Sequence, residues 1–350
     1  MEFNLENILR KNIKNLKPYS SARDEFKGKE GVFLDANENS FGSPLKENYN
    51  RYPDPMQLDV KEKLSKIKGL PIQNIFLGNG SDEAIDILFR AFCEPGKDNV
   101  LICPPTYGMY EVSAGINDVA ILKIPLLPEI FQLDVENVLK ALSPKTKIIF
   151  LCCPNNPTGN GVKWDDIKTI IESFSGIVVI DEAYINFAKY RSLIPELLNY
   201  PNIVILQTLS KAWGLAGLRI GMAFASEPII DIFNKIKPPY NVNAVSQKLA
   251  LEALDNIDKI NSWIKEIVLE RDKLINNLEH IQFIQKVYPS DANFVLVKTS
   301  HPQNIYNYLV SKKVIVRDRS KVELCEGCLR ITVGNKEENK NLIQLLKEYK

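Results

Sequence analysis

The sequence predicts an α/β fold: a large, doubly wound and mostly parallel sheet, followed by a smaller α+β domain. Two observations lead to this prediction. Between residues 74 and 225, short uninterrupted apolar segments alternate with segments of helical periodicity, a pattern typical of strands buried on both faces and separated by helices. After Pro238 and Pro239 the pattern changes to long helices with a few strand-like segments between them.

The strands of the large sheet are predicted from apolar segments that lack the alternation of a half-exposed strand. These segments are 75–77, 100–103, 148–152, 177–180 and 203–206, with a last candidate within 218–225. Helices are predicted between them at 82–92, 164–174 and 193–198. Such an order of elements favours a parallel sheet with helices on each side.

The C-terminal part carries a different succession of elements. Its predicted helices are 243–254, 260–278, 302–311 and one that begins at 337, and its predicted strands are 293–297, 314–316 and 329–333. Residues 1–17 have the apolar periodicity of an amphipathic helix. We therefore expect three regions: an N-terminal arm (1–45) that packs on the small domain or a partner subunit, a large α/β domain (46–240) and a small α+β domain (241–350).

The composition excludes several classes of protein. Lys plus Arg (44) nearly equals Asp plus Glu (43), so the net charge is +1 and lacks the basic excess that duplex nucleic-acid binding requires. No apolar segment approaches the ~18 to 20 residues of a membrane span, and the N-terminus lacks the apolar centre of a secretory signal. We expect a cytoplasmic protein that binds neither nucleic acid nor membrane.

The cysteines and histidines restrict the chemistry further. Cys325 and Cys328 have the spacing of a zinc or redox pair, but this pair stands alone and a structural zinc site needs four ligands, so thiols in a turn are the favoured interpretation and no metal is expected. The chain has 2 histidines, His280 and His301, both in ordinary contexts. Proton transfer is therefore expected to use Lys, Tyr or a carboxylate.

A lysine beyond the strand at 203–206 is the first candidate for chemistry. Lys211 follows Ser210 in a stretch rich in Gly and Ala, with no other charge until Arg219. A lysine that burial holds neutral can attack a carbonyl and form a Schiff base, while a hydroxyl and a guanidinium suit a phosphate. The alternative is a lysine at a strand end without function.

Polar side chains also follow the other strands of the predicted sheet. Asp181 and Tyr184 come directly after the strand at 177–180, where ligands of open α/β sheets bind. Asn156 lies in a turn between two prolines, and Tyr107 follows another strand and presents a flat ring. The alternative is that these features have no function, since acidic residues after strands are common and the segment between the prolines can be a simple turn.

The segment 78–83 joins a strand to a helix and contains two glycines. Its small residues allow backbone N–H groups to approach an anion at the helix N-terminus, although a simple helix cap fits equally well. Together, five strand ends each supply one component of a site for a flat, phosphorylated aldehyde.

With these motifs in place, the sequence resembles the fold-type I pyridoxal-phosphate-dependent aminotransferases over nearly its whole length. The matching segments are 16–19, 37–39, 51–54, 90–97, 104–110, 154–159, 181–184, 208–221 and 327–334, of which the last two are the most discriminating. The resemblance implies transfer of an amino group between a phosphorylated amine, of the histidine pathway, and a 2-oxo acid.

The resemblance also implies a role for each matching residue. Lys211 would form the Schiff base with pyridoxal 5'-phosphate, Asp181 would pair with the pyridine nitrogen, and Asn156 and Tyr184 would bind the phenolic oxygen. Tyr107 would stack on the ring, and the phosphate would be bound by the backbone of Ser81 and Asp82, by Ser210 and Arg219, and by Tyr52 of the second subunit of a homodimer. Arg330 would bind the acidic group of the substrate, and Tyr19 and Arg317 its phosphate.

Three alternatives stay open at this level. A threonine-phosphate decarboxylase or an aromatic amino-acid aminotransferase of the same fold would share most of these residues. A catalytically silent binding protein on this fold is disfavoured by the presence of Lys211, Asp181 and Arg330 together.

Overall fold

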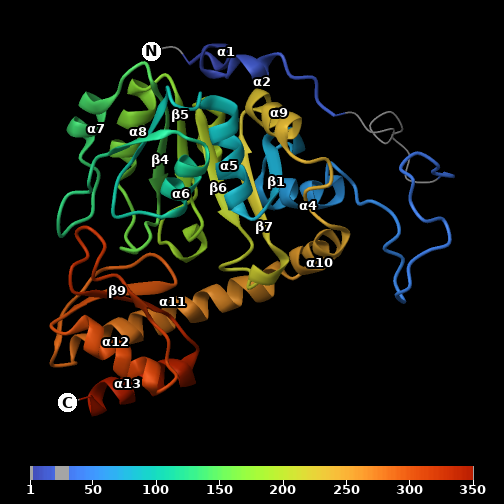
Figure 1. The fold of residues 1–350 in the computed structure, drawn as a ribbon. Coiled ribbons are helices and arrows are strands. Elements are labelled where there is room, and N and C mark those ends of the chain that lie inside the picture. The colour runs from blue at the N-terminus through green and yellow to red at the C-terminus, as the bar shows by residue number, and fades with distance from the viewer. Residues whose placement is uncertain (1–2, 20–30, 350) are drawn as a thin grey trace.

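The computed structural model describes residues 3–19 and 31–349 and contains two sheets (Figure 1). The larger sheet has the strand order β1-β7-β6-β5-β4-β2-β3. Its strands are β1 (Ile75–Asn79), β2 (Asn99–Ile102), β3 (Ala120–Lys123), β4 (Thr146–Cys152), β5 (Ile177–Asp181), β6 (Ile203–Thr208) and β7 (Ile220–Ala225). The predicted strands of the large domain are all present, and the α/β fold class is confirmed.

The direction of β7 is the one departure from a parallel large sheet. From β3 through β2, β4 and β5 to β6 the pairs are parallel, whereas β7 is antiparallel to both β6 and β1. As a result, the start of β7 lies at the same edge as the ends of the parallel strands. The sequence analysis missed β3, an edge strand of four residues that are only partly buried.

Helices cover both faces of the larger sheet, as its continuous apolar strands require. One face packs against α5 (Ser81–Phe92), α6 (Met109–Ile116) and α9 (Glu227–Ile236), the other against α4 (Leu58–Lys68), α7 (Val135–Ala141), α8 (Trp164–Ser173) and α10 (Ala244–Leu254). The predicted helix at 193–198 is a short 3-10 helix, η3 (Ile194–Leu198), and two more such turns are η2 (Ile185–Phe187) and η4 (Ala216–Leu218). Alternate residues of each strand enter the two apolar cores.

The smaller sheet is antiparallel and has the order β10-β11-β9-β8. Its strands are β8 (Ile284–Val287), β9 (Phe294–Thr299), β10 (Arg317–Asp318) and β11 (Cys328–Thr332), and its helices are α11 (Ile257–Glu279), α12 (Pro302–Ser311) and α13 (Lys336–Glu348). The prediction of a strand at 314–316 is wrong, because the pairing with β11 begins only at Arg317. The boundary between the domains at residue 240 stays a prediction.

The N-terminal segment differs from the single helix predicted for residues 1–17. Among the described residues it forms two short helices, α1 (Leu5–Ile8) and α2 (Lys11–Lys14). They are separated at Arg10, whose backbone N–H donates to the carbonyl of Ala91 at 3.0 Å. Leu9 and Ile13 enter the core beside α5 and α9, so this part of the arm packs on the large domain and not on the small one.

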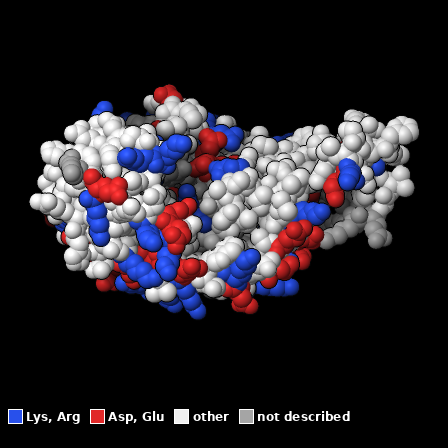
Figure 2. Space-filling model, turned by 90° about the horizontal axis from the view of Figure 1, so that it is seen from below, with Lys and Arg blue, Asp and Glu red and all other residues white. Residues whose placement is uncertain are grey.

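Residues 31–53 extend away from the body of the molecule without a helix or strand (Figure 1). Large apolar side chains of this stretch are exposed, including Val32 (89%), Leu34 (82%) and Phe41 (102%). Within the described residues, no helix is long and apolar enough to cross a membrane. On the face drawn in Figure 2, Lys and Arg are interspersed with Asp and Glu and form no continuous basic stripe.

Candidate active site

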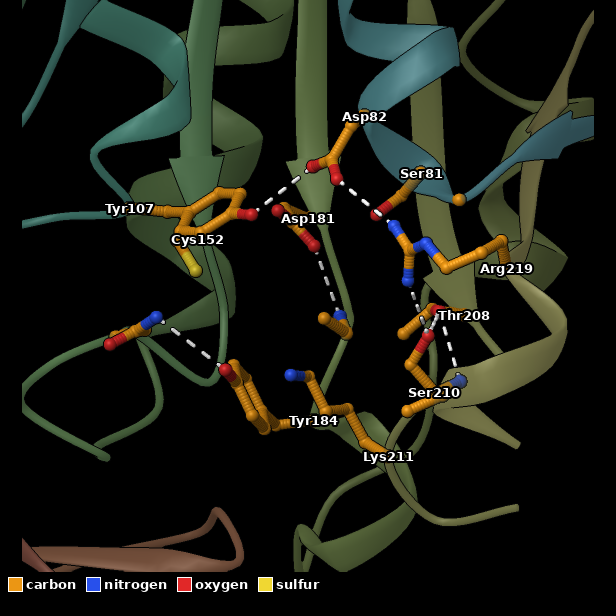
Figure 3. Close-up of a pocket in the computed structure, with 14 residues that line it drawn as sticks. Ser81, Asp82, Tyr107, Cys152, Asp181, Tyr184, Thr208, Ser210, Lys211 and Arg219 are labelled. Atoms are coloured by element: carbon orange, nitrogen blue, oxygen red, sulfur yellow. Dashed lines mark hydrogen bonds and ion pairs between the residues drawn. The ribbon is translucent and has the colours of Figure 1, made fainter. Parts of the chain in front are cut away.

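A pocket lies at the edge of the larger sheet where the parallel strands end and β7 begins (Figure 3). Its lining comes from the ends of β4, β5 and β6, the start of α5 and the turn before β7. It includes nine residues predicted from the sequence: Ser81, Asp82, Tyr107, Asn156, Asp181, Tyr184, Ser210, Lys211 and Arg219. The sheet topology therefore brings together segments that are more than a hundred residues apart in the chain.

One end of the pocket is a polar cradle at the N-terminus of α5. Gly80 precedes this helix with φ of 77°, and a Cβ at this position would lie 2.6 Å from Nη2 of Arg219, so only glycine fits. Nη1 of Arg219 donates to Oγ of Ser210 at 3.5 Å, and Nη2 is 3.4 Å from Oδ2 of Asp82. A helix N-terminus, a hydroxyl and a guanidinium together suit a phosphate.

Asp181 ends β5 at the base of the pocket and is 3% exposed. Its Oδ2 accepts a hydrogen bond from the hydroxyl of Tyr110 at 2.8 Å, and its Oδ1 accepts one from the backbone N–H of Ala183 at 3.1 Å. Burial raises the pKa of this carboxyl to about 6, although the bond from Tyr110 opposes the rise. A buried carboxylate held in this way is suited to pair with a protonated ring nitrogen.

Lys211 points its amine into the pocket, between Asp181 and Tyr184 (Figure 3). Its Nζ lies 5.6 Å from the centre of the Tyr184 ring. The residue is exposed to the open pocket and is not buried as the sequence argument assumed. Partial desolvation, and then the charge of Arg330, nevertheless lower the pKa of the amine, which favours its neutral, nucleophilic form.

Asn156 connects the lysine side of the pocket to the smaller sheet. Its Nδ2 donates to the hydroxyl of Tyr184 at 3.5 Å, and its Oδ1 accepts from Nη1 of Arg330 at 2.5 Å. The guanidinium of Arg330 also lies over the ring of Phe294, 5.1 Å from its centre, and the edge of that ring meets Tyr184. Arg330 thus extends from β11 toward the pocket.

Three predicted residues lie differently from the rest. Tyr52 stacks on Tyr240 with 4.4 Å between ring centres and is not part of the pocket lining of its own chain. Tyr19 is 73% exposed and borders a separate hollow beside Lys237. Arg317 pairs with Arg330 across β10 and β11 and is exposed. Their roles stay predictions.

Tyr107 lines the pocket, and its hydroxyl donates to Oδ1 of Asp82 at 3.1 Å. This bond anchors the ring at the rim, while the stacking inferred from the resemblance stays a prediction. Desolvation, with the charge of Asp82, raises the pKa of Tyr107, so the phenol stays protonated at neutral pH.

Sequence reasoning missed three side chains that complete the site. Tyr110 binds Asp181, Thr208 accepts from the backbone N–H of Ser210 at 3.1 Å, and Phe294 contacts both Tyr184 and Arg330. Tyr110 lies in the first turn of α6, and its ring meets that of Tyr107, which precedes the helix, edge to face at 5.6 Å between ring centres.

The cysteine pair at 325 and 328 forms a turn, since the backbone N–H of Cys328 donates to the carbonyl of Cys325 at 2.9 Å. Both thiols are free and buried, and desolvation raises the pKa of each. Among the residues that the structure describes, no group of three or more His, Cys, Asp or Glu side chains could hold a metal ion.

Comparison with known proteins agrees with this geometry. The model of the family "Aminotransferase class I and II" matches residues 32–346. The chain therefore belongs to the class I and II aminotransferases, a pyridoxal-phosphate-dependent family.

Among curated relatives, the histidinol-phosphate aminotransferase of Cytophaga hutchinsonii is 57% identical over 349 residues, which cover 100% of each chain. Among solved structures, the histidinol-phosphate aminotransferase of Sinorhizobium meliloti, in complex with pyridoxal-5'-phosphate, aligns with a TM-score of 0.79 at 24% identity over 89% of each chain. The L-threonine-O-3-phosphate decarboxylase of Porphyromonas gingivalis aligns with a TM-score of 0.73 at 22% identity, covering 86% of this chain and 90% of its own. These two structural likenesses concern the fold alone.

Proposed function

We propose that this chain is a transaminase that exchanges an amino group between histidinol phosphate and 2-oxoglutarate, with pyridoxal 5'-phosphate as cofactor. The observation that carries the proposal is the identity of 57% over the whole chain to a histidinol-phosphate aminotransferase, combined with a pocket that contains a lysine, a buried aspartate and an anion cradle. The products would be imidazole-acetol phosphate and glutamate, in histidine biosynthesis.

The residues of the pocket fit this cofactor. The cradle at Gly80, Ser210 and Arg219 suits its phosphate, because a side chain at position 80 would fill that space. Asp181 is a buried carboxylate that two neutral donors bind directly, which leaves its charge available for a protonated pyridine nitrogen. When bound, pyridoxal phosphate supplies an aldehyde that condenses with amines and a ring that withdraws electrons from the substrate.

Each side chain around the ring has a defined task in this proposal. Lys211 takes the proton from Cα of the amino substrate, a task for which its lowered pKa suits it. Tyr184 and Asn156 donate hydrogen bonds to the phenolic oxygen, and their own contact at 3.5 Å holds them side by side. Tyr107 covers the ring, and Asp181 keeps its nitrogen protonated.

Arg330 binds the acidic end of each substrate in turn. A guanidinium donates two parallel hydrogen bonds to a carboxylate or a phosphate, so one arginine serves both half-reactions. Desolvation lowers the pKa of Arg330, and its buried Nε has no hydrogen-bond partner among the described residues, which favours an incoming anion. Arg317 and Tyr19 are proposed to contribute to binding of the substrate phosphate.

A second copy of the chain is proposed to complete the site. The stretch at residues 31–53 exposes large apolar side chains to water in the single chain. An interface with a second copy would cover them. Tyr52 lies at the end of this stretch. It is proposed to reach the cofactor phosphate of the partner subunit in a two-fold homodimer.

A panel of half-reactions tests the proposed activity. The purified enzyme, loaded with pyridoxal phosphate, is mixed separately with histidinol phosphate, phenylalanine, threonine phosphate and glutamate, and the change in cofactor absorbance is followed. We expect rapid conversion with histidinol phosphate and with glutamate. Release of carbon dioxide from threonine phosphate, or a preference for phenylalanine, would overturn the assignment in favour of the decarboxylase or the aromatic aminotransferase.

A further inference from the structure

A third arginine of the smaller sheet shares a face with Arg317 and Arg330. Arg317 lies opposite Arg330 in the register of β10 and β11. Beyond the end of β10, the backbone N–H of Arg319 donates to the carbonyl of Cys328 at 2.9 Å, which continues the ladder by one more pair. Side chains alternate along a strand, so Arg319 extends from the same face as Arg317. Arg330 lies directly opposite Arg317 and therefore shares this face.

This face of the smaller sheet is turned toward the large domain. Leu296, which lies opposite Arg330, belongs with Phe294 and Cys328 to the apolar core of the large sheet. Leu329 and Ile331 point the other way, into the core formed with α11, α12 and α13. Burial raises the pKa of Tyr184, and the charges of Arg330 and Arg319 oppose this rise, which places both arginines near the hydroxyl of a residue that lines the pocket.

These three positive charges lack a counter-charge within the described part of the chain. None of the three arginines forms an ion pair there, and Nε of both Arg319 and Arg330 is buried without a hydrogen-bond partner. Asp318, between two of the arginines in sequence, accepts hydrogen bonds from Ser320 instead. Desolvation, followed by the charges of Arg330 and Arg317, lowers the pKa of Arg319, so an anion at this place would relieve mutual repulsion.

The number of arginines indicates the kind of anion. A carboxylate carries one charge and two oxygens, which one guanidinium satisfies. A phosphate monoester carries nearly two charges and three acceptor oxygens at neutral pH, so it can engage further guanidinium groups. We propose that Arg319 is a specificity-determining residue, which binds the phosphate of the phosphorylated substrate and contributes little to binding of glutamate or 2-oxoglutarate. The inference rests on the proposed transaminase function.

The experiment compares phosphorylated and unphosphorylated substrates with R319Q. For the holoenzyme, kcat/KM is measured with histidinol phosphate, with histidinol and with glutamate. We expect R319Q to reduce the preference for histidinol phosphate over histidinol by about tenfold or more, mainly through KM, since the lost bond joins two charged groups. We expect kcat/KM of R319Q for glutamate to stay within about twofold of the wild-type value. R319K, which keeps the charge, is expected to lose less.

K321Q is the matched control, because it removes one positive charge from an exposed side chain two residues further along. It is expected to keep the wild-type preference. Equal losses with all three substrates, or an unchanged preference in R319Q, would overturn the role of Arg319. If R319Q does not fold, R319M, which also removes the charge, provides the same comparison. A wild-type enzyme that ignores the phosphate would instead refute the proposed function itself.

Discussion

The hydroxyl of Tyr110 donates a hydrogen bond to Oδ2 of Asp181 across 2.8 Å, and both residues are buried. The bond joins the first turn of α6 to the end of β5, and these two elements are distant in the chain. It holds the carboxylate at the base of the pocket and favours its charged form. Tyr110 is thus a positioning residue for the aspartate that the cofactor nitrogen needs.

Tyr110→Phe should weaken cofactor binding. The substitution keeps the ring but removes a hydrogen bond to a charged group, so the pKa of Asp181 rises further and its pairing with the pyridine nitrogen weakens. We expect the Kd for pyridoxal phosphate to rise about tenfold. Absorbance titration of the cofactor-free protein measures this. Tyr200→Phe, which removes an exposed hydroxyl bound to Glu172, serves as the control. A Kd of Tyr110→Phe within twofold of the wild-type value would contradict the prediction.

Asp181 should give cofactor-free protein a distinctive pH dependence of stability. Burial raises the pKa of Asp181 from its ordinary value of 3.8 to about 6 in the folded protein, so between these values the folded protein holds a proton that the unfolded chain has lost. The contribution of Asp181 to the free energy of unfolding therefore falls as pH rises through this interval and is constant above it.

We expect the difference in unfolding free energy between wild type and Asp181→Asn to decrease by about 2 kcal/mol from pH 4 to pH 7. Urea unfolding at several pH values measures this difference. Asp231→Asn, at an exposed position of α9, is measured beside it as the control variant. A difference independent of pH would show that Asp181 titrates normally in the folded state.

Lys211 should be the residue that borohydride links to the cofactor. Reduction of the loaded enzyme is expected to leave one pyridoxyl group on the peptide that contains Lys211, because its amine points into the pocket. Lys211→Ala should lose the label and transaminase activity, whereas Lys248→Ala, at an exposed position of α10, should keep both. Peptide mapping by mass spectrometry decides, and a label on another lysine would refute the assignment.

A mixture of two inactive variants tests the position of Tyr52. Tyr52→Ala and Lys211→Ala are purified separately, dissociated and reassociated together. If Tyr52 acts across the interface, half of the dimers are hybrids with one intact site each, and about one quarter of wild-type activity returns. If Tyr52 acts within its own chain, every site of the hybrid carries one defect. In that case activity stays at the level of the separate variants.

Arg271 should contribute strongly to stability. This arginine of α11 is 0% exposed, and its Nη1 donates to the carbonyls of Phe187 at 3.2 Å and Ala292 at 2.9 Å, which joins the small domain to η2 of the large one. Arg271→Met leaves both carbonyls unpaired and should lower the free energy of unfolding by about 2 to 4 kcal/mol. Arg271→Lys should lose less. Urea unfolding checks both variants, and a loss below 0.5 kcal/mol for Arg271→Met would contradict the prediction.

The sequence predicted the strands of the large sheet because their apolar segments are continuous and end at polar residues. Asp181, Asn156 and Lys211 follow those ends and line one pocket, since parallel strands finish at a common edge. β3 escaped prediction because its Ala, Ile, Leu and Lys are partly exposed and show neither pattern. The helix at the N-terminus is divided at Arg10, because a contact with Ala91 replaces a helical bond there, and local periodicity carries no information on such a contact.

The parts of the site that could not be predicted depend on contacts between distant elements. The bond from Tyr110 to Asp181 exists because α6 covers the face of the sheet beside β5. The contact of Phe294 with Tyr184 depends on how the smaller sheet docks on the larger one. Neither relation has a signature in the residues that flank these positions.

The apolar core that includes Leu296 and Cys328 of the smaller sheet also includes Ile149 and Leu151 of the larger one. The two regions therefore share one apolar core, while the other face of the smaller sheet forms a second core with α11, α12 and α13. A fragment that ended near residue 240 would leave that shared surface in contact with water. Each region therefore depends on the other to cover this part of its apolar surface.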